Sequence, residues 1–558
     1  MPQDAFHIRR LVCELNTFLI GGKINRISQV NKDELTFIIY TGKTTVKLII
    51  SANASNARVC LSATEKDPAP VAPNFCMLLR KHLQGAEILE VRQYGFERIV
   101  EIDLHCTTDF SESVRTLHCE LMGKYSNVIL TENGVILGAL KTTALENEAH
   151  RVLLTGAKYL YPAPQEKLSP FDKDGLRTKL EAFFSTHEGF DGETLAVFIF
   201  ENVAGLALAT ARELVGRAGC SPLWEFIGEF CENEPCKPCL KTVNGEAKDF
   251  FAFSVFGAEE MPSLCKAEDE FFTRRERKKS FEDKKRKLEN LARALKKKQT
   301  KKLQDTLERL KEAEKAEEYR VKGELLTANL YRVEKGMASV ELENWYATEG
   351  GVLKISLDTT LSPSKNAQRY FKTYNKHKRA AEILTPMLKK EEAEIEYTDS
   401  VLSAIALSDG LDDLKELETE LTEMGLLRAP KERAGGKKKE TAVPFREFEH
   451  DGKKILVGRN NIQNDRLLRI ASPEDVWLHT QKYHSSHVII ITNGGQVCDE
   501  TLLYAAKLCA YYSDGRDSGK IPVDYCKRKF VKKPSKSKAG FVTYADYKTL
   551  LVEPALPQ

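Results

Sequence analysis

A chain of 558 residues is too long for one hydrophobic core, so we expect two to four domains. Its 84 Lys and Arg residues nearly balance 81 Asp and Glu residues, and no stretch approaches the roughly eighteen continuous apolar residues of a membrane span. The 13 scattered cysteines and the absence of a signal-like N-terminal stretch argue against a secreted disulfide scaffold and predict a cytoplasmic protein with reduced thiols.

Residues 1–170 are predicted to form an α+β head domain. "AFHIRRLVCELNTFL" has the spacing of an amphipathic helix, and "ELTFIIYTGKTTVKLIIS" alternates around Thr41-Gly42 as a β-hairpin does. We expect a helix capped by Asn74, two strands that meet at Tyr94-Gly95, and a type I′ turn at Asn133-Gly134. The proline-punctuated "LLTGAKYLYPAPQEKLSP" is expected to lead out of the domain.

Residues 171–265 are predicted to be helical. "LAVFIFENVAGLALATARELVGRAG" reads as a helix, a turn at Val203-Ala204-Gly205 and a second helix, like a helix–hairpin–helix. The N–H groups at the start of such a second helix can bind phosphate, but many packed helix pairs contain the same glycine turn. "CENEPCKPC" lacks the second ligand pair of a structural zinc site, so ordinary thiols and no metal are expected.

Residues 266–427 are predicted to form a long antiparallel coiled-coil hairpin with a small β tip at about 323–362. Leucines recur at three- and four-residue steps in the first helix, as in an apolar seam. Residues 273–302 contain 15 Lys or Arg and 4 Asp or Glu, whereas residues 387–424 contain 12 Asp or Glu and 3 Lys. A basic linker at 428–444 is expected to lead into a C-terminal α+β domain at 445–558.

The stretch "DVWLHTQKYHSSHVII" raises the question of a metal or catalytic site. It lacks the helical His pairing and the glutamate of a zinc protease, and no nucleophile and base accompany it. Asp475, Trp477 and His479 alternate along a predicted strand, and Ser486 and His487 open the next one. Such a face suits stacking on a nucleotide, but a structural network with Trp477 in the core explains the same pattern.

Two basic stretches are candidate contacts for RNA or the ribosome, because Lys and Arg release counterions from phosphate backbones. Tyrosines lie among the basic residues of the C-terminal stretch and add a capacity for stacking. A solvated charged face is the alternative. The candidates are Lys284, Lys285, Arg286, Lys296, Lys297 and Lys298 in the arm, and Lys527, Arg528, Lys529, Lys532 and Lys533 near the C-terminus.

The head domain contains two further candidate segments. In "FERIVEI", Glu97 and Arg98 follow the Tyr94-Gly95 turn, where the arginine can bind a phosphate and the acid a ribose or amino group. A surface ion pair without function is the alternative. In "ELMGKYSN", a glycine precedes Lys124, Ser126 and Asn127, three side chains able to bind a phosphate or sugar.

Taken together, these segments resemble the NFACT family, which includes the bacterial RqcH proteins, often called fibronectin-binding protein A, and eukaryotic NEMF. The resemblance covers essentially the whole chain. It rests on "ELMGKYSNVIL", "GELLTANLY", "LSPSKNAQRYFKTYNK", "VGRNNIQNDRLL", "DVWLHTQKYHSSHV" and "VDYCKRKFVKKPSKSKAGFVTY", which occur in the family's order.

The resemblance implies a ribosome quality control factor without an active site or cofactor. Such proteins bind a large ribosomal subunit that holds peptidyl-tRNA, recruit alanyl-tRNA, and direct template-free alanine tailing of the stalled chain. It implies partners among ribosomal RNA and the small RNA-binding protein RqcP, and no membrane. The family's tRNA motifs fall on Glu97 with Arg98 and on Glu120, Leu121 and Met122; Glu97 stands where the family usually has aspartate.

Two alternatives accompany this interpretation. The head domain is similar in fold to formamidopyrimidine-DNA glycosylases, whose nucleophile is an N-terminal proline followed by glutamate; here Pro2 is followed by Gln3, and their zinc finger is absent. The name fibronectin-binding protein suggests a surface adhesin, but the sequence shows no export or anchoring segment.

Overall fold

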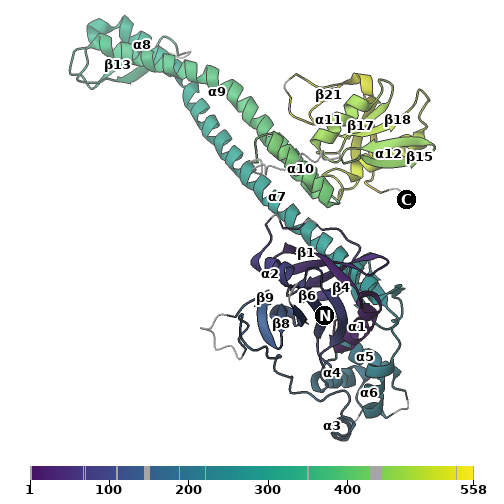
Figure 1. The fold of residues 1–558 in the computed structure, drawn as a ribbon. Coiled ribbons are helices and arrows are strands. Elements are labelled where there is room, and N and C mark those ends of the chain that lie inside the picture. The colour runs from purple at the N-terminus through teal and green to yellow at the C-terminus, as the bar shows by residue number, and fades with distance from the viewer. Residues whose placement is uncertain are drawn as a thin grey trace. The chain divides into compact units, whose positions relative to one another are not determined.

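The computed structural model describes residues 3–66, 68–69, 71–108, 111–143, 151–187, 189–219, 222–347, 351–427, 443–535 and 537–556. Two compact units divide the chain, residues 1–278 and 279–558, and Figure 1 shows the elements of each. Both mix helices with antiparallel sheets, so the protein is a multidomain α+β protein. Pro2 and most of the expected linker lie outside the described residues.

The first unit contains a nine-stranded antiparallel sheet in the order β4-β3-β2-β1-β5-β6-β7-β8-β9. The hairpin at Thr41-Gly42 and the strand pair around Tyr94-Gly95 form as predicted, and Asn133 and Gly134 have the positive φ angles of a type I′ turn, 51° and 76°. Asn74 is the first residue of its helix and not its cap, a place that Pro73 takes. The strands are β1 (Lys23–Asn31), β2 (Glu34–Tyr40), β3 (Thr45–Ser51), β4 (Arg58–Leu61), β5 (Glu87–Gln93), β6 (Ile99–Thr108), β7 (Ser111–Glu120), β8 (Asn127–Glu132) and β9 (Val135–Ala139).

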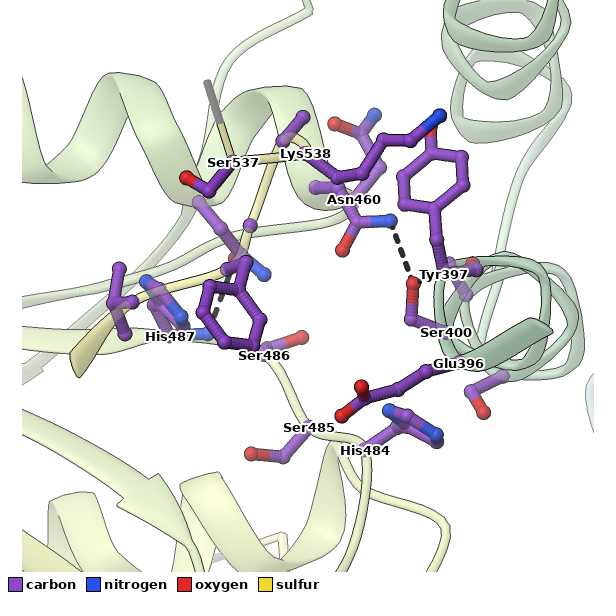
Figure 2. A pocket seen from close by; sticks show the side chains of 18 of the residues that line it. Glu396, Tyr397, Ser400, Asn460, His484, Ser485, Ser486, His487, Ser537 and Lys538 are labelled. Carbon is purple, nitrogen blue, oxygen red and sulfur yellow. Dashed lines mark hydrogen bonds between the residues drawn. The ribbon is translucent and has the colours of Figure 1, made fainter. Parts of the chain in front are cut away.

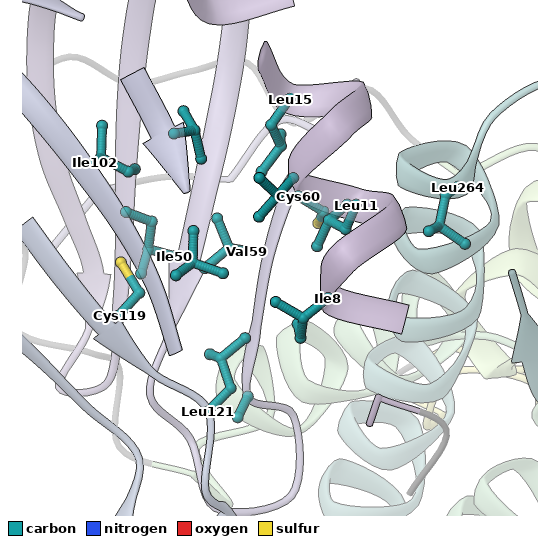
Figure 3. Close-up of a cluster of buried hydrophobic side chains, with 14 of the residues drawn as sticks. Ile8, Leu11, Leu15, Ile50, Val59, Cys60, Ile102, Cys119, Leu121 and Leu264 are labelled. Atoms are coloured by element: carbon teal, nitrogen blue, oxygen red, sulfur yellow. The ribbon is translucent and has the colours of Figure 1, made fainter. Parts of the chain in front are cut away.

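Helices α1 (Ala5–Leu19) and α2 (Asn74–Leu83) pack their apolar faces on this sheet. Figure 3 shows Ile8, Leu11 and Leu15 of α1 directed at the strands, with Leu264 at the start of the long helix beside them. The same buried cluster includes side chains of the helical segment after residue 170. The two segments that the sequence separates at residue 170 therefore share one core.

The helical segment consists of α3 (Lys173–Thr186), α4 (Gly192–Asn202), α5 (Leu208–Arg217) and α6 (Leu223–Asn233). The predicted pair around the 203–205 turn is α4 and α5. Its turn packs against the start of α1, where a Cβ on Gly205 would meet Phe96 and Ala5 within 2.8 Å. The carboxylate of Asp4 accepts the backbone N–H of Ala207 at 2.8 Å and the hydroxyl of Thr210 at 2.5 Å. An internal carboxylate thus occupies the helix end at which we considered a phosphate site.

A small sheet connects this segment to the arm. Strands β10 (Cys239–Val243), β11 (Glu246–Phe251) and β12 (Glu259–Glu260) pack through Leu240 and Phe250 against Phe271. This places the first turns of α7 (Leu264–Glu314) in the first unit. There Arg58 forms ion pairs of 3.2 and 2.8 Å with Glu34 and Glu276, so a buried guanidinium ties the helix to the sheet.

In the second unit, α7 continues and is followed by α8 (Ala316–Ala328), α9 (Pro363–Ala406) and α10 (Leu411–Glu423). Lys296 pairs with Asp399 at 2.7 Å, Lys302 pairs with Glu391 at 3.1 Å, and Tyr319 stacks on His377 at 5.3 Å. Because the partner number falls as the first number rises, the helices run antiparallel, as predicted. The β tip consists of β13 (Ser339–Glu343) and β14 (Val352–Ser356), and α8 extends into the start of the range predicted for it.

The C-terminal segment forms a six-stranded sheet in the order β15-β16-β18-β17-β19-β22. One face packs on α12 (Asp499–Tyr511), and the other packs on α11 (Asn461–Ile470) and on the β20–β21 hairpin. No helix among the described residues combines the length and the apolar character needed to cross a membrane. The strands are β15 (Arg446–His450), β16 (Lys453–Val457), β17 (Val476–Thr480), β18 (Val488–Ile491), β19 (Ile521–Lys527), β20 (Val531–Lys532), β21 (Thr543–Tyr544) and β22 (Lys548–Val552).

Candidate nucleic-acid interface

The sheet of the first unit brings the two head segments together. Ile99 of β6 pairs with Glu120 of β7, and Glu120 pairs with Asn127 of β8. The backbone N–H of Leu121 donates to the carbonyl of Arg98 at 2.9 Å. Side chains that are more than twenty residues apart in the sequence therefore meet at one end of three adjacent strands. We call the turn at 94–98 and the segment 120–127 the head site.

Glu120 is buried at the base of the head site, with 1% of its surface exposed. Its carboxylate accepts hydrogen bonds from Arg151 at 2.5 and 3.2 Å and from the hydroxyl of Tyr159 at 2.8 Å. Internal donors therefore occupy three of the roughly four lone-pair sites of this buried carboxylate. We therefore correct the expectation that Glu120 binds tRNA directly. Its carboxylate instead positions the neighbouring residues.

A second buried carboxylate lies on the adjacent strand. Glu101 accepts hydrogen bonds from His118 at 2.9 Å, from Tyr161 at 2.6 Å and from Arg92 at 2.8 Å. Burial would raise its pKa, but these hydrogen bonds and the charge of Arg92 lower the pKa of Glu101 to about 2. Glu101 is therefore an ionised carboxylate that accepts three internal hydrogen bonds.

Tyr159 and Tyr161 come from the segment that was expected to leave the domain. Instead, Lys158 bridges to Val135 of β9, and Tyr159 packs on the sheet. The ring of Tyr161 stacks on that of Tyr94 with 3.6 Å between centroids. The sequence did not predict that this segment returns to the sheet, because prolines indicate turns but not the direction of the chain after them.

The segment 122–127 exposes only part of its predicted set. Lys124 and Tyr125 are exposed and Met122 is half-buried, whereas Ser126 and Asn127 are buried. The side-chain oxygen of Asn127 accepts two backbone N–H groups at 2.9 Å, those of Val128 and Lys141. We correct the expectation that Ser126 and Asn127 bind a phosphate, because both side chains are buried. Lys124 retains that capacity.

Glu97 and Arg98 are both half-buried beside this segment. Although both residues are described, the structure contains no ion pair between them. Burial raises the pKa of Glu97 above its usual value, although the charge and the backbone N–H of Arg98 lower it. The guanidinium is therefore not held by its neighbouring acid and keeps its donors for another partner.

In the second unit, Asp475 and Trp477 lie in the core. The carboxylate of Asp475 accepts the N–H groups of Ser472 and Thr492 at 2.8 Å each. Trp477 is 0% exposed, and its ring lies 4.8 Å from that of Tyr544 in the covering hairpin. The expectation that these two residues stack on a nucleotide is corrected, because no face of the indole is open.

The two histidines behind Trp477 are neutral. His479 lies parallel to the indole at 5.7 Å, and His487 meets it edge-on at 5.3 Å. Burial lowers the pKa of His479 to about 4 and that of His487 well below its usual value. These rings, together with Ser486, line a cavity, so they can offer hydrogen bonds but no positive charge at neutral pH.

Most basic side chains near the C-terminus have internal partners. Lys527 and Lys529 both pair with Glu474, at 2.7 and 2.8 Å. Arg528 donates to the carbonyl of Leu468, and Lys533 pairs with Asp465. Lys532 is exposed. The charge in this stretch is partly neutralised, which a count of residues could not reveal.

The basic residues of the arm also include some that have internal partners and others that are exposed. Lys284 pairs with Glu418 at 2.7 Å, Lys285 donates to the carbonyl of Ala406 at 2.7 Å, and Lys296 pairs with Asp399. In contrast, Lys297 and Lys298 are exposed, as is Arg286 beside Asp283. The basic and acidic stretches of the arm face each other, and only part of the basic charge is available to another molecule.

The acidic end of the arm also binds the C-terminal sheet. Asp413 is 1% exposed and receives Arg446 at 3.4 Å and Arg459 at 2.7 Å. Asn461, at the start of α11, donates to Ser400 and Glu420 at 3.0 Å each. The "VGRNNIQNDRLL" motif therefore joins the sheet to α9 and α10.

Cys231 and Cys239 are buried thiols, and Cys236 is an exposed one. Within the part of the chain that the structure describes, no group of three or more His, Cys, Asp or Glu side chains could hold a metal ion.

Comparison with known proteins places these sites in a family context. Residues 4–441 match the model of the NFACT N-terminal and middle domains, and residues 443–544 match that of the NFACT protein RNA binding domain. The chain is 34% identical over 572 residues to the Rqc2 homolog RqcH of Bacillus subtilis, covering 99% of this chain and 98% of the relative.

Two more distant similarities accompany these matches. The human ribosome quality control complex subunit NEMF is 27% identical over 139 residues, covering 25% of this chain and 12% of that protein. Among solved structures, the N-terminal part of the fibronectin/fibrinogen-binding protein from Streptococcus suis is 28% identical with a TM-score of 0.42, covering 48% of this chain and 98% of that one.

Proposed function

Because the chain belongs to the NFACT family, we propose that it is a ribosome quality control factor. In this role it binds a stalled large ribosomal subunit carrying peptidyl-tRNA, recruits alanyl-tRNA, and directs the template-free addition of alanines that mark the nascent chain for degradation. The finer part of the proposal, alanine tailing, rests on the motifs that resemble the family's tRNA-binding segments.

One observation carries the proposal: the head site unites both tRNA-motif segments, with Leu121 hydrogen-bonded to Arg98. Around a half-buried arginine, the site presents an exposed lysine and an exposed tyrosine, and its Tyr94 stacks on Tyr161 of the neighbouring segment. A guanidinium and an ammonium can bind the phosphates of a tRNA, and open aromatic faces can stack on its unpaired bases.

The second unit is assigned to the ribosome. The exposed basic residues of the arm, including Arg286, Lys297 and Lys298, would contact the phosphates of ribosomal RNA, and Lys532 would do the same from the C-terminal domain. The small RNA-binding protein RqcP is a further proposed partner. In this division of labour, the first unit selects the tRNA while the second holds the subunit.

We infer that the factor adds no catalytic centre of its own, and that the ribosome joins the alanines. Pro2→Gly should leave tail addition unchanged, whereas a glycosylase would lose its nucleophile. Strand cleavage of oxidised-base DNA that disappears in Pro2→Gly would favour the glycosylase alternative.

Sedimentation of the tagged full chain from a lysate, with sequencing of the RNA that it retains, tests the function. The expected result is large-subunit ribosomal RNA together with alanine tRNA in the same fractions. A chain that stays at the top of the gradient and retains neither RNA would contradict the proposal.

A further inference from the structure

A cavity of about 730 Å³ lies within the second unit, between α9 and the C-terminal sheet. Figure 2 shows Tyr397 and Ser400 of α9 on one side, and Ser486, His487 and the loop at Ser537-Lys538 on the other. Cavities of roughly 300–1,000 Å³ are the usual size of small-ligand sites. The cavity can hold one nucleotide and is too small for a duplex.

Two polar atoms without partners belong to residues that line this space. His487 is 1% exposed and lines the cavity, yet its Nδ1 atom has no hydrogen-bond partner; nor has the Oγ atom of Ser537 in the same lining. A buried polar atom without a partner is unfavourable, and natural proteins rarely keep one without a reason. Both atoms are buried, so a small turn of each side chain toward the cavity would let a ligand with donors and acceptors along one edge satisfy them.

Flat apolar surface adjoins these atoms. Tyr397, Phe541 and Tyr544 contribute aromatic rings to the lining, and the hydroxyl of Tyr397 is fixed by Glu420 at 2.6 Å. Aromatic rings beside neutral imidazole, amide and hydroxyl groups suit a planar, uncharged ring system with polar edges, which is the chemistry of a nucleobase.

The rim carries charge of both signs. Lys538 lies 5.2 Å above the ring of Tyr397, and Lys390 and Arg459 also belong to the lining. Glu394 and Glu396 stand on the α9 side. A phosphate can bind the ammonium groups while a carboxylate accepts a ribose hydroxyl, an arrangement that fits a nucleotide better than a bare base.

We propose that this cavity takes one unpaired nucleotide of an RNA strand, with its base among Tyr397, Phe541 and Tyr544 and its phosphate beside Lys538. The base edge meets His487 and Ser486. This inference deepens the proposed function and rests on it, since it names the element of RNA that the second unit recognises: a nucleotide turned out of its stack.

Photo-cross-linking of the full chain to a single-stranded ribo-octamer that contains one 4-thiouridine tests the inference. Mass spectrometry should place the cross-link on Tyr397, Phe541 or Tyr544. Ala539→Trp, which fills the cavity from its lining loop, should lower the yield at least tenfold, and Lys538→Ala should lower it severalfold. Ser535→Trp is the matched control, because Ser535 is an exposed residue of the same loop outside the lining, and its yield should equal that of the wild type.

Two results would overturn the inference: a cross-link only at other residues, or an undiminished cross-link in an Ala539→Trp protein that melts like the wild type. Displacement by equimolar adenosine monophosphate would contradict an RNA strand as the occupant. Sedimentation with large subunits is scored separately. A wild-type chain that pellets with subunits without cross-linking in the cavity defeats this inference alone, whereas failure to pellet defeats the proposed function.

Discussion

Arg151 donates two hydrogen bonds to the carboxylate of Glu120, from Nη2 to Oε1 at 2.5 Å and from Nη1 to Oε2 at 3.2 Å. Glu120 directly precedes Leu121, whose backbone N–H donates to the carbonyl of Arg98. Glu120 is thus the anchor that sets the position of the 120–122 segment against the Arg98 turn.

Glu120→Ala should loosen the head site. It leaves the Arg151 guanidinium and the Tyr159 hydroxyl without their acceptor, and breaking a buried ion pair costs about 3 kcal/mol. Hydrogen exchange of the β7 and β8 peptides, followed by mass spectrometry, should accelerate about a hundredfold. Glu97→Ala serves as the control. Among the described residues of the head site, the Glu97 carboxylate forms no ion pair with the neighbouring Arg98. Equal exchange in both variants would remove Glu120 from this role.

Acid should destabilise the C-terminal sheet. His479 has a pKa of about 4 in the folded protein, and that of His487 is also depressed, whereas both approach about 6.5 when unfolded. Between these pKa values the unfolded chain binds protons that the folded chain does not, so the free energy of unfolding falls as pH drops from 7 to 5, by about 2 kcal/mol for each histidine and about 4 kcal/mol for the pair. Trp477 fluorescence, in a chain with Trp224→Phe and Trp345→Phe, reports this transition. His479→Asn should reduce this loss by about half, since His487 remains, and an unchanged slope would contradict the assignment.

The arm's exposed charges should govern the salt dependence of subunit binding. Changing Arg286, Lys297 and Lys298 to Gln removes three exposed cations, so the slope of log K against log salt should become shallower by about 2. The matched variant changes Lys284, Lys285 and Lys296 to Gln; it should lower the melting temperature and change the slope less, because these lysines bind α9 and α10. Equal slopes in both variants would mean that the exposed face is only solvated.

The sequence predicted the elements of the fold well where periodicity and turn chemistry are local. The hairpin at Thr41-Gly42, the type I′ turn at Asn133-Gly134 and the antiparallel arm all form. It could not predict burial. The alternation of Asp475 and Trp477 fits a surface as well as a core, and Trp477 is buried because α11 and the hairpin ending at Tyr544 cover it.

The head site shows the same limit. The motifs identified Arg98, Met122 and Lys124, but nothing local indicated that Arg151 and Tyr159 hold Glu120 from a distant segment. Counts of charged residues also could not predict ion pairs. The charges of Lys296 and Asp399, for example, neutralise each other across the arm. Such partners depend on long-range contacts, which a spacing pattern does not encode.

Recovery of tRNA from pelleted large subunits tests the central claim most directly. Glu97→Ala with Arg98→Ala removes the free guanidinium and its acidic neighbour without touching the second unit. The account predicts that this double variant still pellets with large subunits, yet recovers no alanine tRNA and adds no alanine tail. Arg98→Lys alone should also impair recovery, because an ammonium lacks the planar fork of arginine. Normal tRNA recovery, or loss of the subunit together with the tRNA, would contradict the division of labour between the two units.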